Sequence, residues 1–150
     1  MNYPDERCLS CERYAKILDD YIDKNGADIV KNRLTESEIK ELLSRISFVP
    51  GIQLLDFMKK YSYLAREEVE FFGLSKILME KSNLYEVTKL LHKNYPSTKG
   101  YYVIFKDGPY YVLVDSEDRT YDFFTDFERP EPRYSSFYLY IIERFYKTKP

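Results

Sequence analysis

Two cysteines stand three residues apart near the start of the chain, in the run Cys8-Leu9-Ser10-Cys11. This spacing is typical of a redox dithiol or of half a structural zinc site. A redox pair follows a strand and sits at a helix N-terminus that stabilises the thiolate, and no strand pattern precedes Cys8. A structural zinc ion needs four ligands, but the chain has no further cysteine and only one histidine. We therefore expect both cysteines to be reduced, metal-free and buried on the apolar side of a helix.

His92 is the single imidazole of the chain. A catalytic histidine works with a nucleophile or an orienting carboxylate, and the sequence marks neither beside residues 89–93. A cation near a helix C-terminus suits the helix dipole, so we expect His92 on a helix surface. Adjacent carboxylates such as Glu67 and Glu68 occur in any acid-rich chain, and no phosphate-loop, dinucleotide or zinc-protease motif is present. We expect no enzyme activity, no catalytic residue, no bound metal and no cofactor.

The composition excludes several classes of protein. The chain carries 23 basic and 25 acidic residues, a net charge of −2, whereas a protein that coats DNA or RNA is strongly basic. Hydrophobic residues make up 44% of the chain, which is ample for a core. No apolar run approaches the roughly 18 residues of a membrane span, and the first residues lack the apolar segment of a signal peptide. We expect a cytoplasmic protein that binds neither nucleic acid nor membrane.

The first sixty residues carry the signals of three helices. A helical stripe predicts a helix over residues 4–24 that stops at Asn25-Gly26, where glycine takes the left-handed cap conformation. Thr35 and Glu38 form a capping box that begins a second helix, and a third begins at Pro50. The predicted apolar faces are Cys8, Cys11, Ala15, Leu18 and Ile22, then Ile39, Leu42, Leu43 and Ile46, then Leu54, Leu55, Met58 and Tyr61.

Strand signals follow. Residues 68–71 alternate polar and apolar, and Asn83 begins a further helix that ends at Asn94. The β-rich runs 101–106 and 110–115 flank Asp107-Gly108, a preferred hairpin dipeptide, and a third run covers 120–125. Ser135 and Ser136 cap a closing helix with the stripe Phe137, Tyr140, Ile141 and Phe145. The sequence predicts an α+β fold: N-terminal helices, a central, mostly antiparallel meander sheet and a closing C-terminal helix. We expect one domain over residues 1–150, with residues 1–33 as a helical extension and 34–150 as the core.

Acidic and aromatic residues gather in the second half of the chain. Residues 76–106 carry a net charge of +4, whereas residues 107–131 hold eight acidic residues against two arginines, a net charge of −6. Residues 101–146 contain 15 of the 26 aromatic residues. Tyrosine beside carboxylates is typical of a protein-recognition surface, since a platform for single-stranded nucleic acid needs basic neighbours. The alternative without a binding function is that these acidic turns are only a solvated surface.

We expect a partner-binding surface on this acidic stretch. Its carboxylates would steer a basic partner and pair with lysine or arginine, and its tyrosines would supply buried contact area. The candidate residues are Asp107, Tyr111, Asp115, Glu117, Asp118, Asp126, Glu128, Glu131 and Tyr134.

The order of elements over residues 34–146 also matches a known pattern. The capping-box helix is followed by Val49-Pro50 and the run Leu55-Asp-Phe-Met-Lys-Lys-Tyr61, then by a strand over 69–74 and a helix around 85–88. Paired strands around Asp107-Gly108-Pro109 and the Ser-Phe run 135–141 close the pattern. In these features the chain resembles the SUKH superfamily, the cell-wall-assembly-regulator-like immunity proteins. It departs from the family at Ser62-Tyr63, where Asn-Gly or Gly-Gly is common, and it lacks the usual tryptophan.

The resemblance implies a non-enzymatic protein that binds the toxic domain of a polymorphic toxin, often a nuclease, inside the producing bacterium. A nuclease is basic around its active site because it holds phosphate, so an acidic inhibitor surface suits it. We therefore expect an immunity protein, a monomer or weak dimer, that neutralises a cognate toxin by stoichiometric binding. A regulatory interaction module, as implied by eukaryotic relatives, is the first alternative. A small carboxylate-based hydrolase and a single-strand nucleic-acid binder are the alternatives from other classes.

Overall fold

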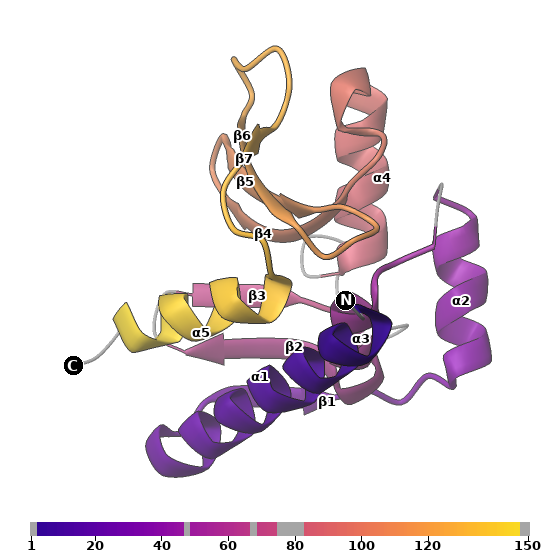
Figure 1. The fold of residues 1–150 in the computed structure, drawn as a ribbon. Coiled ribbons are helices and arrows are strands. Elements are labelled where there is room, and N and C mark those ends of the chain that lie inside the picture. Colours follow the sequence, from indigo (N-terminus) through magenta and orange to yellow (C-terminus); the bar gives the residue numbers. More distant parts are fainter. Residues whose placement is uncertain (1–2, 47–48, 67–68, 75–82, 148–150) are drawn as a thin grey trace.

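The computed structural model describes residues 3–46, 49–66, 69–74 and 83–147. Within these residues the chain forms five α-helices and seven strands, arranged in two antiparallel sheets (Figure 1). The predicted α+β class and closing helix are confirmed. No helix in the described ranges is long and apolar enough to cross a membrane. The helices are α1 (Tyr3–Asn25), α2 (Glu36–Ser44), α3 (Ile52–Lys60), α4 (Leu84–Asn94) and α5 (Phe137–Lys147), and a short 3-10 helix, η2, spans Pro96–Thr98.

The first sheet has the order β1-β2-β3 and contains two strands that the sequence did not indicate. Its strands are β1 (Asp28–Lys31), β2 (Tyr61–Arg66) and β3 (Val69–Phe72). Tyr61, predicted as the last apolar position of the third helix, instead has extended backbone angles and begins β2. The central place of β2, between β1 and β3, explains this, since the pairing on both sides buries Leu64 and Ala65. All four residues of β1 are exposed, so no alternating apolar pattern marks this strand.

The second sheet has the order β4-β5-β6-β7 and contains the predicted hairpin. Its strands are β4 (Tyr102–Asp107), β5 (Tyr110–Val114), β6 (Thr120–Phe124) and β7 (Glu131–Pro132). Asp107 pairs with Tyr110 across the turn, and Gly108 has a φ of +61°, which glycine adopts without strain. Helix α4 covers one face of this sheet, where the hydroxyl of Thr88 accepts the backbone N–H of Val103 over 2.9 Å.

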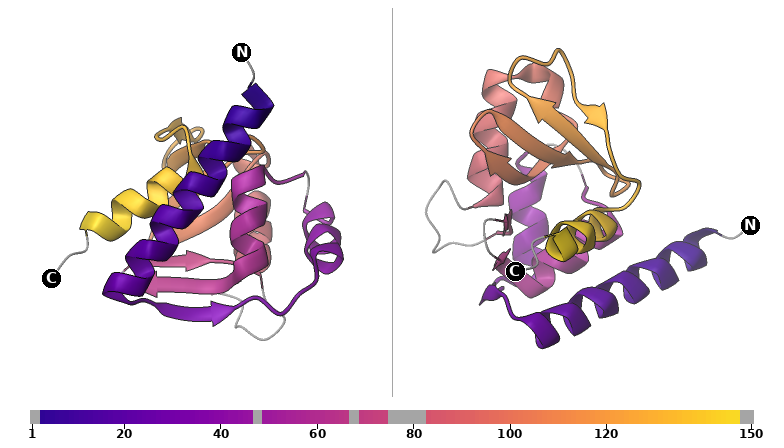
Figure 2. Two further views of the ribbon diagram at one scale, coloured as in Figure 1. Left: turned by 60° about the horizontal axis from the view of Figure 1, so that its bottom comes forward. Right: turned by 90° about the vertical axis from the view of Figure 1, so that its left-hand side faces the viewer.

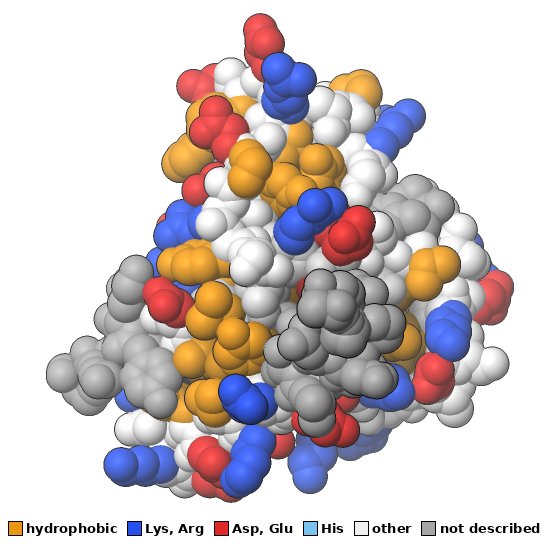
Figure 3. Space-filling view, viewed as in Figure 1, with side chains coloured by type: hydrophobic (Ala, Val, Ile, Leu, Met, Phe, Trp, Pro, Cys, Tyr) orange, Lys and Arg blue, Asp and Glu red, His pale blue; other side chains and the backbone are white. Residues whose placement is uncertain are grey.

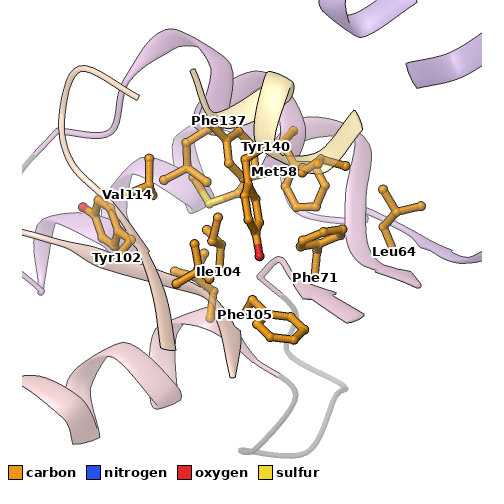
Figure 4. Packing of buried hydrophobic residues seen from close by; sticks show 14 of the residues in the cluster. Met58, Leu64, Phe71, Tyr102, Ile104, Phe105, Val114, Phe137 and Tyr140 are labelled. Carbon is orange, nitrogen blue, oxygen red and sulfur yellow. The ribbon is translucent and has the colours of Figure 1, made fainter. Parts of the chain in front are cut away.

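One hydrophobic cluster joins the two sheets and the helices that cover them. Phe71 of β3 lies at its centre, with its ring centroid 6.3 Å from that of Phe105 and 5.9 Å from that of Tyr140. Figure 4 shows these rings between strands of both sheets, α3 and α5. Every position of the predicted α5 stripe is at most 1% exposed, so the closing helix packs on both sheets rather than on one. The stripe is Phe137, Tyr140, Ile141 and Phe145.

Helix α1 lies at the outside of the molecule, crosses α3 and α5 (Figure 2) and contributes one side to this cluster. Cys11, Ala15 and Leu18 are buried along its inner side, as the predicted stripe requires. The side chain of Cys8 lies outside the described residues. The helix ends as predicted, with Gly26 at a φ of +86° and its N–H bonded to the carbonyl of Ile22 over 2.7 Å.

Predicted caps fix three further helix starts. Thr35 and Glu38 form the reciprocal bonds of a capping box at α2. The side chain of Asn83 accepts the N–H of Tyr85 at α4, and the hydroxyl of Ser136 accepts the N–H of Leu139 over 3.2 Å at α5. These local signals are reliable because each one satisfies a backbone donor that the helix itself leaves free.

Candidate functional site

Two loops meet at one end of the second sheet. The backbone N–H of Thr125 donates to the carbonyl of Pro109 over 3.1 Å, which joins the loop after β6 to the turn between β4 and β5. Asp107 lies at this turn, Asp126 and Glu128 lie in the joined loop, and Glu131 begins β7; all four are exposed. The structure therefore gathers the predicted residues Asp107, Asp126, Glu128 and Glu131 at this end. We define the distal surface as Asp107, Tyr110, Phe124, Asp126, Phe127, Glu128 and Glu131.

Strand register sets which side chains share this surface. Asp107 pairs with Tyr110, and Tyr110 pairs with Phe124, so these three side chains form a row on one face of the sheet. The ring of Phe124 lies 4.8 Å from that of Tyr110 and 5.3 Å from that of Phe127. Phe124 nevertheless remains 39% exposed. The row thus places Asp107 and the exposed Phe124 on the same face of the sheet, opposite α4, with Tyr110 between them.

The acids of the distal surface are not ion-paired within the described ranges, although the exposed Arg129 belongs to the same loop. Among the residues that the structure describes, the carboxylates of Asp107, Asp126, Glu128 and Glu131 form no hydrogen bond and no ion pair. Figure 3 shows acidic side chains beside hydrophobic ones at the upper end of the molecule, over the β4–β5 turn and the β6–β7 loop. Like charges held on neighbouring loops repel, so this arrangement lowers stability and complements a cationic partner.

Asp122 and Arg133 hold the distal surface against the core. Arg133 Nη1 donates to both carboxylate oxygens of Asp122, over 3.0 and 3.1 Å, and the hydroxyl of Tyr110 donates to Asp122. Burial, followed by the hydrogen bond to Asp122, raises the pKa of Tyr110 and keeps its hydroxyl protonated. The guanidinium of Arg133 also lies over the rings of Tyr134 and Tyr140, the latter on α5. The aromatic row is therefore fixed before any partner arrives.

Asp115 corrects the predicted contact set, because it is only 8% exposed. Its carboxylate accepts the backbone N–H groups of Glu117 and Arg119 over 2.9 and 3.0 Å, the Nε of Arg119 over 2.9 Å and the hydroxyl of Tyr121 over 2.8 Å. Burial opposes ionisation of Asp115, but these hydrogen bonds outweigh it and lower its pKa. Asp115 therefore shapes the β5–β6 turn and is not an exposed contact.

Asp118 is a second correction, since it is 7% exposed and caps a distant helix. Its two carboxylate oxygens accept the backbone N–H groups of Gln53 and Leu54 over 2.9 and 3.0 Å, at the start of α3. The N-cap of α3 is Gly51, which has no side chain to do this. An acid at a helix N-terminus also suits the helix dipole. The charge of Asp118 therefore serves the fold and is not available for a partner.

The three other predicted residues lie away from the distal surface. Glu117 is exposed but belongs to the β5–β6 turn, at the opposite end of the sheet. Tyr111 is half-buried on the α4 side, beneath the ammonium of Lys106 at 5.5 Å from its ring centroid. Tyr134 is half-buried as well, and its hydroxyl donates to Glu143 of α5 over 3.3 Å.

Sequence reasoning missed the aromatic members of the distal surface. Tyr110, Phe124 and Phe127 were not among the candidates, although one signal could have found Tyr110. The Asp-Gly turn fixes the hairpin register, and period-two alternation then puts Tyr110 on the face of Asp107 and Tyr111 on the opposite face.

The expected surface position of His92 is wrong. His92 is 8% exposed, and its Nε2 lies 2.7 Å from the carbonyl oxygen of Tyr101. Burial lowers the pKa of His92, so the neutral ring donates its Nε2–H to this carbonyl. The histidine lies near the C-terminus of α4 as predicted, but on the side that packs against the second sheet.

A groove of about 420 Å³ lies between α1 and α3. The charged side chains on its walls bind one another. Lys60 lies 3.8 Å from Asp19 and 3.4 Å from Asp56, and Lys16 lies 3.2 Å from Asp20. Across the described ranges, no group of three His, Cys, Asp or Glu side chains is placed to hold a metal ion. The groove is therefore a weaker candidate than the distal surface, whose acids are not ion-paired within the described ranges.

No protein-family model matches the chain, and a search of curated proteins finds none that is similar to it. Membership of the SUKH superfamily therefore stays a prediction from the motifs quoted above. The distal surface is the feature from which a function can be inferred.

Proposed function

We propose that this chain is an immunity protein that neutralises a bacterial toxin by binding a basic region of its toxic domain through the distal surface. One observation carries the proposal: four exposed carboxylates without an ion partner, in the described part of the chain, lie on the turn, loop and strand at the end of the sheet where Phe124 is exposed. The toxin identity within the proposal rests on the resemblance to SUKH proteins.

The physical case concerns steering and anchoring. Carboxylates at an exposed rim raise the association rate with a basic protein and make it depend on salt. Aromatic anchors supply the desolvated contact area that slows dissociation, and a truncated anchor typically costs about 2 kcal/mol or more of binding energy. The distal surface offers both on a support that Asp122 and Arg133 hold in place. A nuclease toxin would present the matching charge, because its active site must hold phosphate.

The first experiment measures protection from the toxin encoded beside this gene. The chain is co-expressed with that toxin, and growth is compared with that of cells carrying the toxin alone. We expect the wild-type chain to restore growth and the double variant Asp126→Lys/Glu128→Lys to fail. Glu117→Lys is the control, since it reverses an exposed charge at the opposite end of the sheet, where Glu117 lies 3.6 Å from Arg119. Protection by the double variant, or no protection by the wild type, would contradict the proposal.

The second experiment separates a toxin from a regulatory partner. The tagged chain is used to capture partners from its native cell, and the complex is sized by light scattering after gel filtration. We expect a stoichiometric complex with a basic toxic domain, whose association rate falls as salt rises. Capture of a regulatory protein instead would favour the interaction-module alternative over the immunity function.

A further inference from the structure

We propose that the distal surface recognises an arginine side chain of its partner, which stacks on Phe124 and pairs with the neighbouring carboxylates. This inference rests on the proposed function, because it names the group that the basic partner presents. It can also fail alone, since a partner that binds through lysines would leave the immunity function intact.

The ring of Phe124 is a preformed platform for a cation. It is tilted by 34° against Tyr110 and by 58° against Phe127, so both neighbours support it and fix its orientation. Its 39% exposure leaves much of the ring open to solvent. A cation over an aromatic face is attracted by the negative potential of the ring, and arginine takes this place more often than lysine.

Two carboxylates belong to the turn next to that ring and to a strand of the same sheet. Asp107 stands two strands away in the same cross-strand row, which corresponds to about 10 Å between backbones. The N–H of Phe127 donates to the carbonyl of Phe124 over 2.9 Å, and the resulting turn holds Asp126 next to the rings. A planar guanidinium can lie on a ring and present its N–H edge to a carboxylate at the same time. An ammonium is a compact, strongly hydrated point charge that cannot make both contacts as well.

The chain already contains such an arrangement on the same face of the sheet. The guanidinium of Arg133 lies 5.4 Å from the ring centroid of Tyr134, and it donates to both oxygens of Asp122. Its Nη1 also donates to the hydroxyl of Tyr110 over 3.4 Å, so Arg133 borders the open row directly. The distal surface repeats the combination of ring and carboxylate, and the cation–ring contacts of the described ranges involve rings other than Phe124.

The test uses the full chain and three peptides, acetyl-Gly-X-Gly-X-Gly-amide, in which X is arginine, lysine or citrulline. Citrulline keeps the planar shape of arginine and removes its charge. Dissociation constants are obtained by NMR from the aromatic resonances of Phe124 and Tyr110. We expect the arginine peptide to bind at least about threefold more tightly than the lysine peptide, and the citrulline peptide to bind most weakly.

Three variants separate the contribution of the ring from that of the carboxylates. Phe124→Leu should abolish the preference for arginine, whereas Phe124→Tyr should keep it, and circular dichroism confirms that both remain folded. The double variant Asp107→Asn/Asp126→Asn should raise the dissociation constants of both the arginine and the lysine peptide. Three results would overturn the inference. The arginine and lysine peptides could bind equally, the preference for arginine could survive in Phe124→Leu, or the resonances of the distal surface could stay unshifted at every peptide concentration. The growth assay with the adjacent toxin decides the proposed function separately.

Discussion

The carboxylate of Asp118 occupies the space that a side chain on Gly51 would need. A Cβ placed on Gly51 would lie 2.4 Å from the Cγ of Asp118. The two residues therefore share one cap: Gly51 holds the N-cap position of α3, and Asp118 supplies the acceptor oxygens from the β5–β6 turn. Asp118 has a φ of +66°, which is uncommon for a residue with a side chain. The turn accepts this conformation while its carboxylate caps α3.

Moving the cap back to Gly51 should reverse the sign of one substitution. In the wild-type chain, Gly51→Ser should lower the free energy of unfolding by about 1–3 kcal/mol, because its side chain collides with Asp118. In an Asp118→Gly chain, the same serine can cap α3 itself and should raise stability by roughly a few tenths of a kcal/mol. Urea unfolding of the four chains measures both effects. Destabilisation by Gly51→Ser in both backgrounds would show that Asp118 is not the reason for glycine at this position.

Asp115 should make the fold sensitive to acid. Burial opposes ionisation of Asp115, but the hydrogen bonds it accepts lower its pKa below the ordinary value. A carboxyl with a lowered pKa stabilises the fold above its unfolded pKa of about 3.9, and this contribution is lost as the pH falls through the folded value. Asp115→Asn should lower the free energy of unfolding by about 1–3 kcal/mol at pH 7. The decrease of this free energy between about pH 5 and pH 2 should then be shallower than in the wild type.

The measurement is the free energy of unfolding as a function of pH. Glu117→Gln is the control, because it removes an exposed acid from the same turn and should leave the acid-induced fall unchanged. Parallel curves for Asp115→Asn and the wild type would exclude the paired Asp115 carboxylate as the source of acid sensitivity.

His92 should affect stability near neutral pH without affecting partner binding. Because burial lowers its pKa, the folded chain holds His92 neutral, and the unfolded chain takes up a proton more readily. The free energy of unfolding should therefore be highest above the unfolded pKa of about 6.5 and should decline as the pH falls below that value. His92→Gln should remove this dependence, as judged by thermal unfolding between pH 5 and pH 8. A change in partner affinity larger than about twofold would instead connect His92 with the binding surface, since buried positions away from an interface do not alter its contacts.

Neutralising the distal acids should raise stability while weakening binding. The variant Asp126→Asn/Glu128→Gln relieves repulsion among carboxylates that have no ion partner in the described ranges. We expect its melting temperature to rise by about 1–2 °C, as small surface-charge changes typically give. Its association rate with the partner should fall, and the salt dependence of that rate should become shallower. A lower melting temperature would indicate that these carboxylates stabilise the fold and are not uncompensated.

Signals from residues close together in sequence were sufficient to predict much of the fold. The caps at Thr35, Asn83 and Ser136, the stop at Gly26 and the Asp-Gly turn are all as predicted, because each depends on residues close together in sequence. Strands β1 and β2 were missed for a physical reason. β1 is exposed along its whole length, and β2 takes its extended shape from partners on either side, which local sequence does not reveal.

The candidate site shows the same division between local and distant information. Net charge located the acidic stretch, but it could not separate the acid that caps a helix, Asp118, from one that faces solvent, Asp126. Whether an acid of this stretch caps a helix depends on where the N-terminus of α3 lies, and α3 is far away in sequence. The placement of Tyr110 opposite Asp107 was within reach of the sequence, because the Asp-Gly turn alone sets this register.

The contact between α1 and α5 has a consequence for synthesis of the protein. The hydroxyl of Tyr21 donates to the backbone carbonyl of Phe145 over 2.8 Å, and their rings stack 5.9 Å apart. A nascent chain cannot close this contact until the 124 residues from Tyr21 to Phe145 have been made, which takes on the order of ten seconds at typical elongation rates. Until then, the side of α1 that packs on α5 stays uncovered, and chaperones that bind exposed apolar segments can reach it. The finished fold thus forms only after α5 has been made and has met α1.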